Sequence, residues 1–236
     1  MVSLGDIQTV VRGGANAKKA QGLMRYFKVG KGQYGQGDKF LGVDVPTLRV
    51  IARRYQDLGL PATERLLHSQ FHEERELALM IMVLKSKQAD RALREKLYSL
   101  YLASTKYINN WDLVDGSAEY IVGKYLEDKP KAPLSTLARS QSLWERRIAI
   151  VATYWYIKRG KSQETLRIGE ILLSDPHDLI HKAVGWMLRE VGKRCSMGAE
   201  EAFLKNNYRH MPRTMLRYAI ERFPQEKRIA YLHGTI

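Results

Sequence analysis

The chain has 236 residues, and its 39 lysines and arginines outnumber its 25 aspartates and glutamates, which gives a net charge of +14. One cysteine, Cys195, excludes a disulfide framework and a cysteine-rich zinc site and is expected to be structural. The longest apolar runs, residues 77–84 and 148–157, are too short to cross a bilayer, and no export signal is expected. The positive surplus favours a polyanionic partner, above all nucleic acid, in a cytoplasmic, nucleoid-associated protein.

Residues 29–43, VGKGQYGQGDKFLGV, contain five glycines and no apolar face of helical period. We expect a loop or a β-hairpin here. The segment matches the dinucleotide fingerprint G-x-G-x-x-G, but no strand precedes it, no helix follows directly and no acidic residue lies about 20 positions on, so we expect no dinucleotide site. Lys31 and Lys39 are instead candidate contacts to a phosphate backbone, and a plain surface hairpin is the alternative.

Apolar residues recur at helical spacing along most of the chain, most clearly in residues 77–84, 93–101, 166–172 and 183–191. Short breaks rich in Gly, Pro, Asp, Asn and Ser separate the stripes, as helix–helix connections do. We therefore expect an all-α chain of short helices in one domain over residues 1–236. Stacked helix pairs would make an α-solenoid of HEAT-like repeats with a concave basic face, whereas a compact orthogonal bundle would show the same periodicity.

Residues 109–115, NNWDLVD, combine a helix start with an indole and a carboxylate. Asn109 or Asn110 is a suitable N-cap, and this places Trp111 and Asp115 one turn apart on the same face. A carboxylate beside an indole could stabilise a developing cation. Alternatively, Trp111 belongs to the core and Asp115 is a surface or capping acid.

Two adjacent arginines, Arg146 and Arg147, follow a predicted helix start near Ser142. On a helix they cannot both face solvent in the same direction. One guanidinium is a candidate to reach a phosphate or to orient a carboxylate, because its planar fork suits both. An ordinary ion pair with Glu145 is the alternative.

A third helical segment, residues 179–194, places Lys182, Trp186, Arg189 and Lys193 on one stripe. Gly185 lies beside the indole in mid-helix, where glycine is about 1 kcal/mol less favourable than alanine, and this predicts close approach by a backbone or a ligand. Cations around one aromatic ring favour nucleic-acid contact. A solvated helix with Trp186 in a groove is the alternative.

The last helix start, after Pro212, carries Arg213 and Arg217 one turn apart, which predicts a phosphate clamp or, more simply, a basic surface. Metal chemistry is not expected. His177 and His181 are four residues apart, but no third ligand is evident, and His72 has no second histidine on its face. We expect neither a metal nor a cofactor.

Four blocks of this sequence, in order, resemble the HEAT-like-repeat DNA glycosylases of alkylation repair, the AlkD-like family. The likeness runs from about residue 26 to residue 222, and four ordered blocks are more specific than any single motif. The blocks are residues 110–115 (NWDLVD), 143–149 (LWERRIA), 180–190 (IHKAVGWMLRE) and 211–221 (MPRTMLRYAIE).

The resemblance implies roles for individual residues. Trp111 and Trp186 are similar to the two aromatic residues that flank the damaged nucleotide, and Asp115 is similar to the catalytic carboxylate. Arg147 is similar to the arginine that contacts the backbone beside the lesion, and Tyr26 to a tyrosine near that site. The family implies a monomeric, monofunctional glycosylase that acts on duplex DNA containing alkylated purines, without metal or cofactor and without flipping the base.

The chemistry of that reaction agrees with these residues. A purine alkylated at N3 or N7 carries a positive charge and leaves as a neutral base, so no general acid is needed. Asp115 would stabilise the oxocarbenium-like sugar and orient the attacking water, while indole faces would attract the sugar's electron-poor C–H groups. Some relatives bind branched or distorted DNA without excising bases, so a non-catalytic DNA-binding protein is the alternative. A repeat scaffold that binds protein or RNA comes third.

Overall fold

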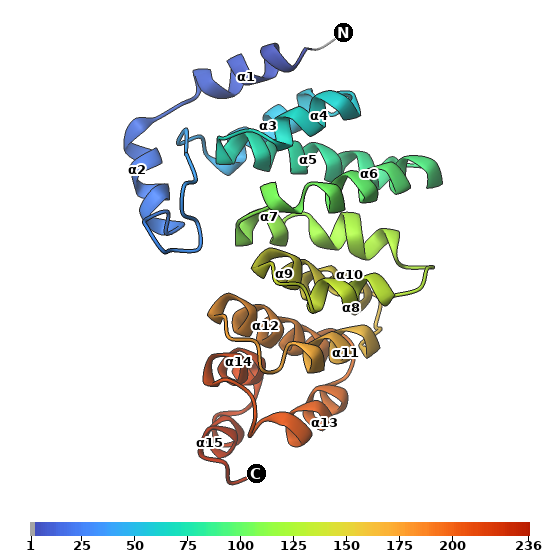
Figure 1. Ribbon diagram of the computed structural model, residues 1–236. Coiled ribbons are helices and arrows are strands. Elements are labelled where there is room, and N and C mark those ends of the chain that lie inside the picture. The colour runs from blue at the N-terminus through green and yellow to red at the C-terminus, as the bar shows by residue number, and fades with distance from the viewer. Residues whose placement is uncertain (1–2) are drawn as a thin grey trace. The chain divides into compact units, whose positions relative to one another are not determined.

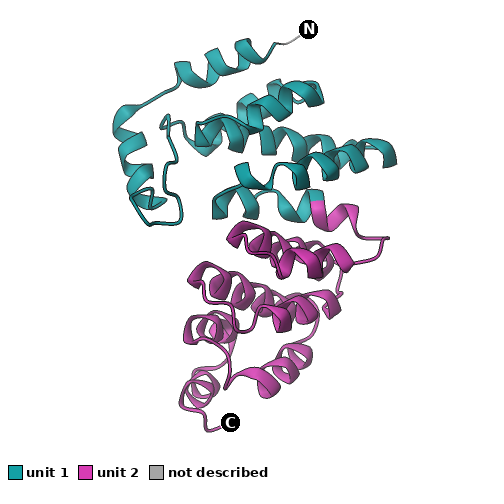
Figure 2. Cartoon of the chain, viewed as in Figure 1, with its two compact units in different colours: residues 1–121 teal, residues 122–236 magenta. Residues whose placement is uncertain are grey.

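The computed structural model describes residues 3–236, and over that range it contains helices and turns but no strand. The chain divides into two compact units, Met1–Ile121 and Val122–Ile236 (Figure 2). The expected all-α fold of stacked helices is confirmed. The single domain over residues 1–236 and its concave basic face stay predictions. Within residues 3–236 no helix combines the length and the apolarity needed to cross a membrane.

The first unit is built around α5, His72–Gln88, which packs against α1, α3, α4, α6 and α7. Because neighbours cover several of its faces, α5 has apolar residues all round rather than on one stripe. In Figure 1 the helices of this unit are coloured from blue, at the N-terminus, to green. They are α1 (Leu4–Gly13), α2 (Ala17–Tyr26), α3 (Val45–Arg54), α4 (Leu60–Leu67), α5, α6 (Arg91–Ala103), the short 3₁₀ helix η1 (Thr105–Tyr107) and α7 (Trp111–Asp115).

The second unit is built around α12, Asp178–Arg194, which packs against α9, α11, α13 and α14. A π-helical turn, η2 (Glu119–Gly123), spans the boundary between the units. The remaining elements are α8 (Ala132–Ala138), α9 (Leu143–Ala152), α10 (Tyr154–Ile157), α11 (Gln163–Ile171), α13 (Met197–Asn207), α14 (Arg213–Ala219), η3 (Ile220–Arg222) and α15 (Gln225–His233).

Gly185 allows α12 and α14 to approach closely. A Cβ atom at this position would lie 2.4 Å from the carbonyl oxygen of Met215 and 2.6 Å from Cβ of Tyr218. The prediction that this glycine marks close backbone approach is confirmed. The approaching group is a neighbouring helix, so the glycine is explained by helix packing.

The glycine-rich segment, residues 29–43, is a loop of turns, so of the two expectations the loop is correct and the hairpin is wrong. Its one β-type contact is an isolated parallel bridge between Lys39 and Phe71. Gly32, Gly37 and Gly42 have positive φ angles, which interrupt any extended run that a hairpin would need. The segment is held instead by side chains of α5, as described below.

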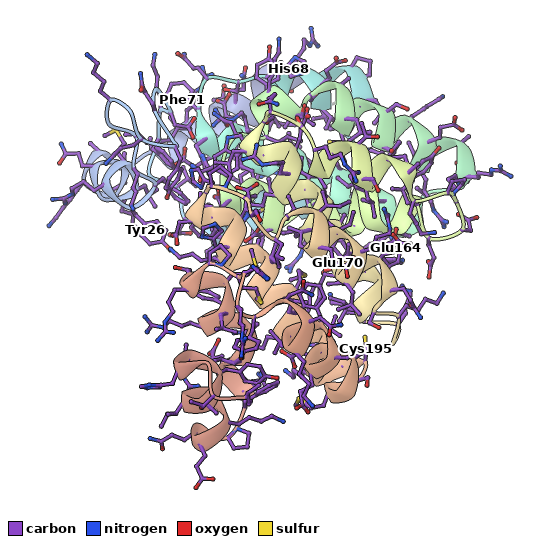
Figure 3. The ribbon with its side chains drawn as sticks, turned by 60° about the horizontal axis from the view of Figure 1, so that its bottom comes forward. Tyr26, His68, Phe71, Glu164, Glu170 and Cys195 are labelled. Atoms are coloured by element: carbon purple, nitrogen blue, oxygen red, sulfur yellow. The ribbon has the colours of Figure 1, made fainter. Side chains whose placement is uncertain are left out.

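Cys195 is half-buried and donates its S–H to the carbonyl oxygen of Ile157 at 3.4 Å (Figure 3). Burial raises the pKa of its thiol, so the thiolate is disfavoured. These observations fit the expected structural role.

Candidate functional site

The short helix α7, Trp111–Asp115, carries the indole and the carboxylate that the sequence singled out. Of the two candidate caps, Asn110 is the N-cap, and its side-chain oxygen accepts a hydrogen bond from the backbone N–H of Trp111 at 2.9 Å. Leu113 and Val114 are buried and anchor one face of the helix. Trp111 and Asp115 are half-buried, so both remain accessible from outside the core.

Two cavities of the first unit meet at α7. One, of about 530 Å³, reaches Asp115 and contains three basic side chains in its wall, those of Arg49, Arg53 and Lys87. The other, of about 620 Å³, is mostly apolar and extends to Tyr26. Both are lined by Val45, Glu76, Trp111 and Asp112. The indole therefore stands between a charged cavity and an apolar one.

An aromatic cluster surrounds Trp111. The Tyr26 ring meets it edge-on, with ring centroids 5.9 Å apart, and the Phe27 ring lies 5.4 Å away. Phe27 in turn stacks on Phe40 of the glycine-rich segment at 5.2 Å. Tyr26 is 63% exposed and lies at the surface of the unit (Figure 3). The structure thus brings together Tyr26, Trp111 and Asp115 around α7.

A buried charged network lies beneath this cluster, centred on His72. Its Nδ1 is 2.9 Å from a carboxylate oxygen of Asp38, and its Nε2 is 2.7 Å from one of Asp112. Burial lowers the pKa of His72, but the hydrogen bonds and charges of Asp112 and Asp38 outweigh it and raise the pKa to about 9. His72 is therefore an imidazolium at neutral pH, held between two carboxylates.

Glu76, one turn along α5 from His72, faces both cavities. Burial raises its pKa to about 7, and the negative charge of Asp112 adds to the effect, while His72 and Arg49 oppose it. Donor atoms of His72, Glu76 and Asp112 lie within 4.8 Å of one another, close enough to surround a cation. However, Nε2 lies 2.7 Å from a carboxylate oxygen of Asp112, the separation of a direct charge-assisted N–H···O hydrogen bond, and this bond occupies the ring nitrogen that could otherwise ligate a metal. The geometry therefore favours a proton at this position.

Sequence reasoning missed this network. It set His72 aside because no second histidine shares its face, and it treated Asp112 as part of the NWDLVD motif without a role. The three members lie at positions 38, 72 and 112, so no local spacing connects them. The available signal was the polar sequence His-Glu-Glu-Arg at positions 72–75, on the first turn of a helix whose middle, residues 77–84, is apolar.

In the second unit, Arg147 is buried and only 5% exposed. Its guanidinium donates to the carbonyl oxygen of Leu179, in the first turn of α12, and so ties α9 to that helix. Trp186, on α12, is half-buried, and its ring centroid lies 5.8 Å from that of Tyr154. The other arginine of the pair, Arg146, forms an ion pair with Asp175 at 2.6 Å.

The cationic stripe of α12 includes acidic partners. Lys182 pairs with Asp178 at 2.7 Å, and Arg189 pairs with Glu221 of η3 and lies 3.5 Å from Glu190. Lys193 is exposed. The stripe is therefore a mixed-sign surface rather than an unbroken row of cations.

The other predicted DNA contacts differ in how they are held. Arg213 donates to the carbonyl oxygen of Leu232, and Lys39 donates to the side-chain oxygen of Gln70 at 2.8 Å. Lys31 and Arg217 are exposed. As contacts to DNA, all of these residues stay predictions.

The sequence and the structure of this chain were both found to be similar to those of known proteins. The family model described as "DNA alkylation repair enzyme" matches residues 7–223. Among solved structures, the chain is similar to a predicted DNA alkylation repair enzyme from Enterococcus faecalis, at 14% identity and a TM-score of 0.69, covering 89% of this chain and 97% of that one. At that identity the structural likeness shows the fold alone. Among curated proteins the comparison finds no match.

Proposed function

Because the chain belongs to the DNA alkylation repair enzyme family, we propose that it is a monofunctional DNA glycosylase. It removes N3- and N7-alkylated purines from duplex DNA by hydrolysing the N-glycosidic bond, the first step of base excision repair. The observation that carries the proposal is the pairing of Trp111 and Asp115 on one capped helical turn, in the wall of an open cavity. The aromatic ring of Tyr26 stands against the indole.

The chemistry divides the acids of α7 between two tasks. Both acids line the charged cavity, but Asp112 is engaged by the His72 imidazolium, while Asp115 lies one turn from Trp111 at the other end of α7. A cationic purine is already a good leaving group, so the enzyme must chiefly stabilise the positive charge that develops on the sugar. A fixed carboxylate does so by Coulombic attraction in a partly dry site, and it also orients the attacking water. Asp115 is the acid placed for that work.

The geometry also supports excision of a base that remains stacked in the duplex. Enzymes that flip a base hold it in a fitted pocket, often between aromatic or apolar faces. Here the Tyr26 and Trp111 rings meet at an interplanar angle of 70°, which leaves no parallel slot between them for a base. Trp111 is better placed to contact a sugar than to sandwich a base.

DNA is held, in this proposal, by positive side chains of both units. The candidates are Lys31, Lys39, Arg146, Lys182, Arg189, Lys193, Arg213 and Arg217, with the aromatic ring of Tyr26 beside them. Trp186 and Arg147 would act with Trp111 and Asp115 at the damaged nucleotide. The protein works as a monomer in the cytoplasm with the nucleoid DNA, and it uses neither a metal nor a cofactor. The alternative function, binding of branched or distorted DNA without excision, is favoured by one observation: the glycine-rich loop exposes two lysines, Lys31 and Lys39.

Base release tests the proposal. Duplex DNA containing 7-methylguanine is incubated with the wild type, with Asp115→Asn and with Asp57→Asn, a matched control at an exposed acid of the same unit. Free 7-methylguanine is then measured by chromatography. We expect release by the wild type and by Asp57→Asn but not by Asp115→Asn. Salt-sensitive duplex binding by all three proteins without release would instead establish the non-catalytic alternative.

A further inference from the structure

Three segments that are distant in the sequence converge on one buried side chain. The His72 side chain is 2% exposed, and it bridges Asp38, in the glycine-rich segment, and Asp112, on α7. The N···O distances are 2.9 Å and 2.7 Å, both within hydrogen-bond range. One imidazole thus connects the loop, the central helix α5 and the helix that carries Trp111 and Asp115.

The Asp38 end of this connection is fixed independently of α7. Arg75, also on α5, pairs with the other carboxylate oxygen of Asp38. Glu73 accepts hydrogen bonds from the backbone N–H groups of Leu41 at 2.9 Å and of Gly42 at 2.7 Å. Gly42 has φ +83°, and a Cβ there would lie 2.1 Å from the carbonyl oxygen of Asn16. The glycine-rich segment is therefore held in one position against α5, and Asp38 is a rigid hydrogen-bond partner for Nδ1 of His72.

The hydrogen bond between His72 and Asp112 restrains the short helix α7. A helix of five residues has too few internal hydrogen bonds to hold its own orientation, so its packing decides where its side chains point. Leu113 and Val114 anchor the buried face. Asp112, which lies between Trp111 and Asp115 in the sequence, ties the helix to His72. Rotation of α7 about its axis would break this bond.

We propose that His72 is a positioning residue for base excision, which locks the rotation of α7 and thereby aims Trp111 and Asp115 at the sugar of the damaged nucleotide. His72 itself touches neither DNA nor the reacting atoms; it acts through Asp112. The inference rests on the proposed function, because it assigns the reaction to the residues that α7 carries.

The lock depends on the proton that His72 holds. The charged groups around it are Asp38 from the loop, Glu73, Arg75 and Glu76 from α5, and Asp112 from α7, while Arg49 of α3 faces Glu76. With the pKa of His72 raised to about 9 by Asp112 and Asp38 against its burial, the proton is present at neutral pH and is lost as the pH rises through about 9. The lock weakens in that range, so excision should fall there.

The test compares excision with binding in matched variants. His72→Gln removes the bridge, because one amide cannot reproduce an imidazolium that donates to both carboxylates. Asp112→Asn is the conservative variant, since its amide oxygen still accepts from Nε2–H. Glu74→Gln is the control: Glu74 is on the same turn of α5 and equally buried, but it pairs with Arg12 of α1 at 2.7 Å, away from α7.

We expect His72→Gln to slow single-turnover release of 7-methylguanine by about 10- to 100-fold, the range produced by misplacing reacting groups by up to about 1 Å. Its duplex Kd should stay within about twofold of the wild type. Asp112→Asn should retain more of the wild-type excision rate than His72→Gln does. Glu74→Gln should retain the full wild-type rate, although its Tm should fall by an amount similar to that of His72→Gln. The fall in rate above pH 9 should be absent in His72→Gln.

Two outcomes would overturn the inference: a wild-type excision rate in His72→Gln, or an equal loss of rate in Glu74→Gln. Neither affects the proposed function, which fails only if the wild type releases no base. Hydrogen exchange supplies a readout that does not need activity. His72→Gln should speed amide exchange in residues 111–115 and Glu74→Gln should not, and equal exchange in the two variants would exclude the lock.

Discussion

Two helices of 17 residues, α5 and α12, form the centres of their units but differ in where they place most of their charge, although α12 also buries Glu190. The first turn of α5 buries its charged side chains, from His72 to Arg75, each within a network that leads to the loop, to α1 or to α7. In α12, Lys182 and Arg189 lie at the surface in ion pairs that solvent can reach. A buried charge fixes geometry because it cannot be left unpaired, whereas a surface charge can exchange its partner for a phosphate.

The largest effect we expect comes from breaking the buried network. Asp38→Ala leaves His72 and Arg75 without their shared carboxylate in a dry site, and losing one partner of a buried pair typically lowers the free energy of unfolding by about 3–5 kcal/mol. Urea denaturation measures the change. A loss below about 1 kcal/mol would show that water reaches this network and that α5 does not differ from α12 in the way described.

A smaller effect should follow from crowding the packing of α12. Gly185→Ala would drive a Cβ into the backbone of α14, and overpacking of this kind typically destabilises by about 1–3 kcal/mol. Gly22→Ala in α2 is the matched control, because a Cβ there meets nothing within 4 Å, and it should stabilise by up to about 1 kcal/mol. Thermal unfolding of the two variants measures both changes in stability. A neutral Gly185→Ala would mean that α14 can move away freely.

Stability should also depend on pH through His72. Its pKa is raised from 6.5 to about 9 by Asp112 and Asp38, which outweigh burial, so the folded protein binds the proton more tightly than the unfolded chain. The stabilisation is complete below pH 6.5 and is lost as the pH rises through about 9. The urea midpoint of the wild type minus that of His72→Gln, measured from pH 6 to pH 10, should shrink over this window. A constant difference would contradict the imidazolium.

The smallest effects belong to the surface of α12. Asp178→Ala removes an exposed pair with Lys182 and should change the free energy of unfolding by no more than about 0.5 kcal/mol, as measured by urea denaturation.

In DNA binding the same surface should matter more. Lys193→Ala should weaken duplex affinity and reduce the magnitude of the slope of log Kd against log salt by about 1. Fluorescence anisotropy at several salt concentrations measures it. An unchanged slope would remove Lys193 from the DNA contacts.

The range of each interaction along the chain decides whether the sequence could predict it. Local patterns predicted the helices, an asparagine cap before Trp111 and a close approach at Gly185, because each depends on neighbours within one or two turns or on one unusual residue. The structure then decided between Asn109 and Asn110 and between a backbone and a ligand. The network of Asp38, His72 and Asp112 depends on the tertiary fold, and no spacing reveals it. The same holds for the pairing of Arg189 with Glu221, 32 residues further along the chain, which makes the stripe of α12 a mixed surface.

The central claim is that Asp115 of α7 performs the chemistry of base release. The most direct measurement is the single-turnover rate of 7-methylguanine release by the wild type and by Asp115→Asn, with enzyme in excess over one duplex and with duplex affinity measured in parallel. We predict a loss of at least about 100-fold in rate, the size expected when one preorganised electrostatic group is removed, at unchanged affinity. Equal rates for the two proteins would contradict the account.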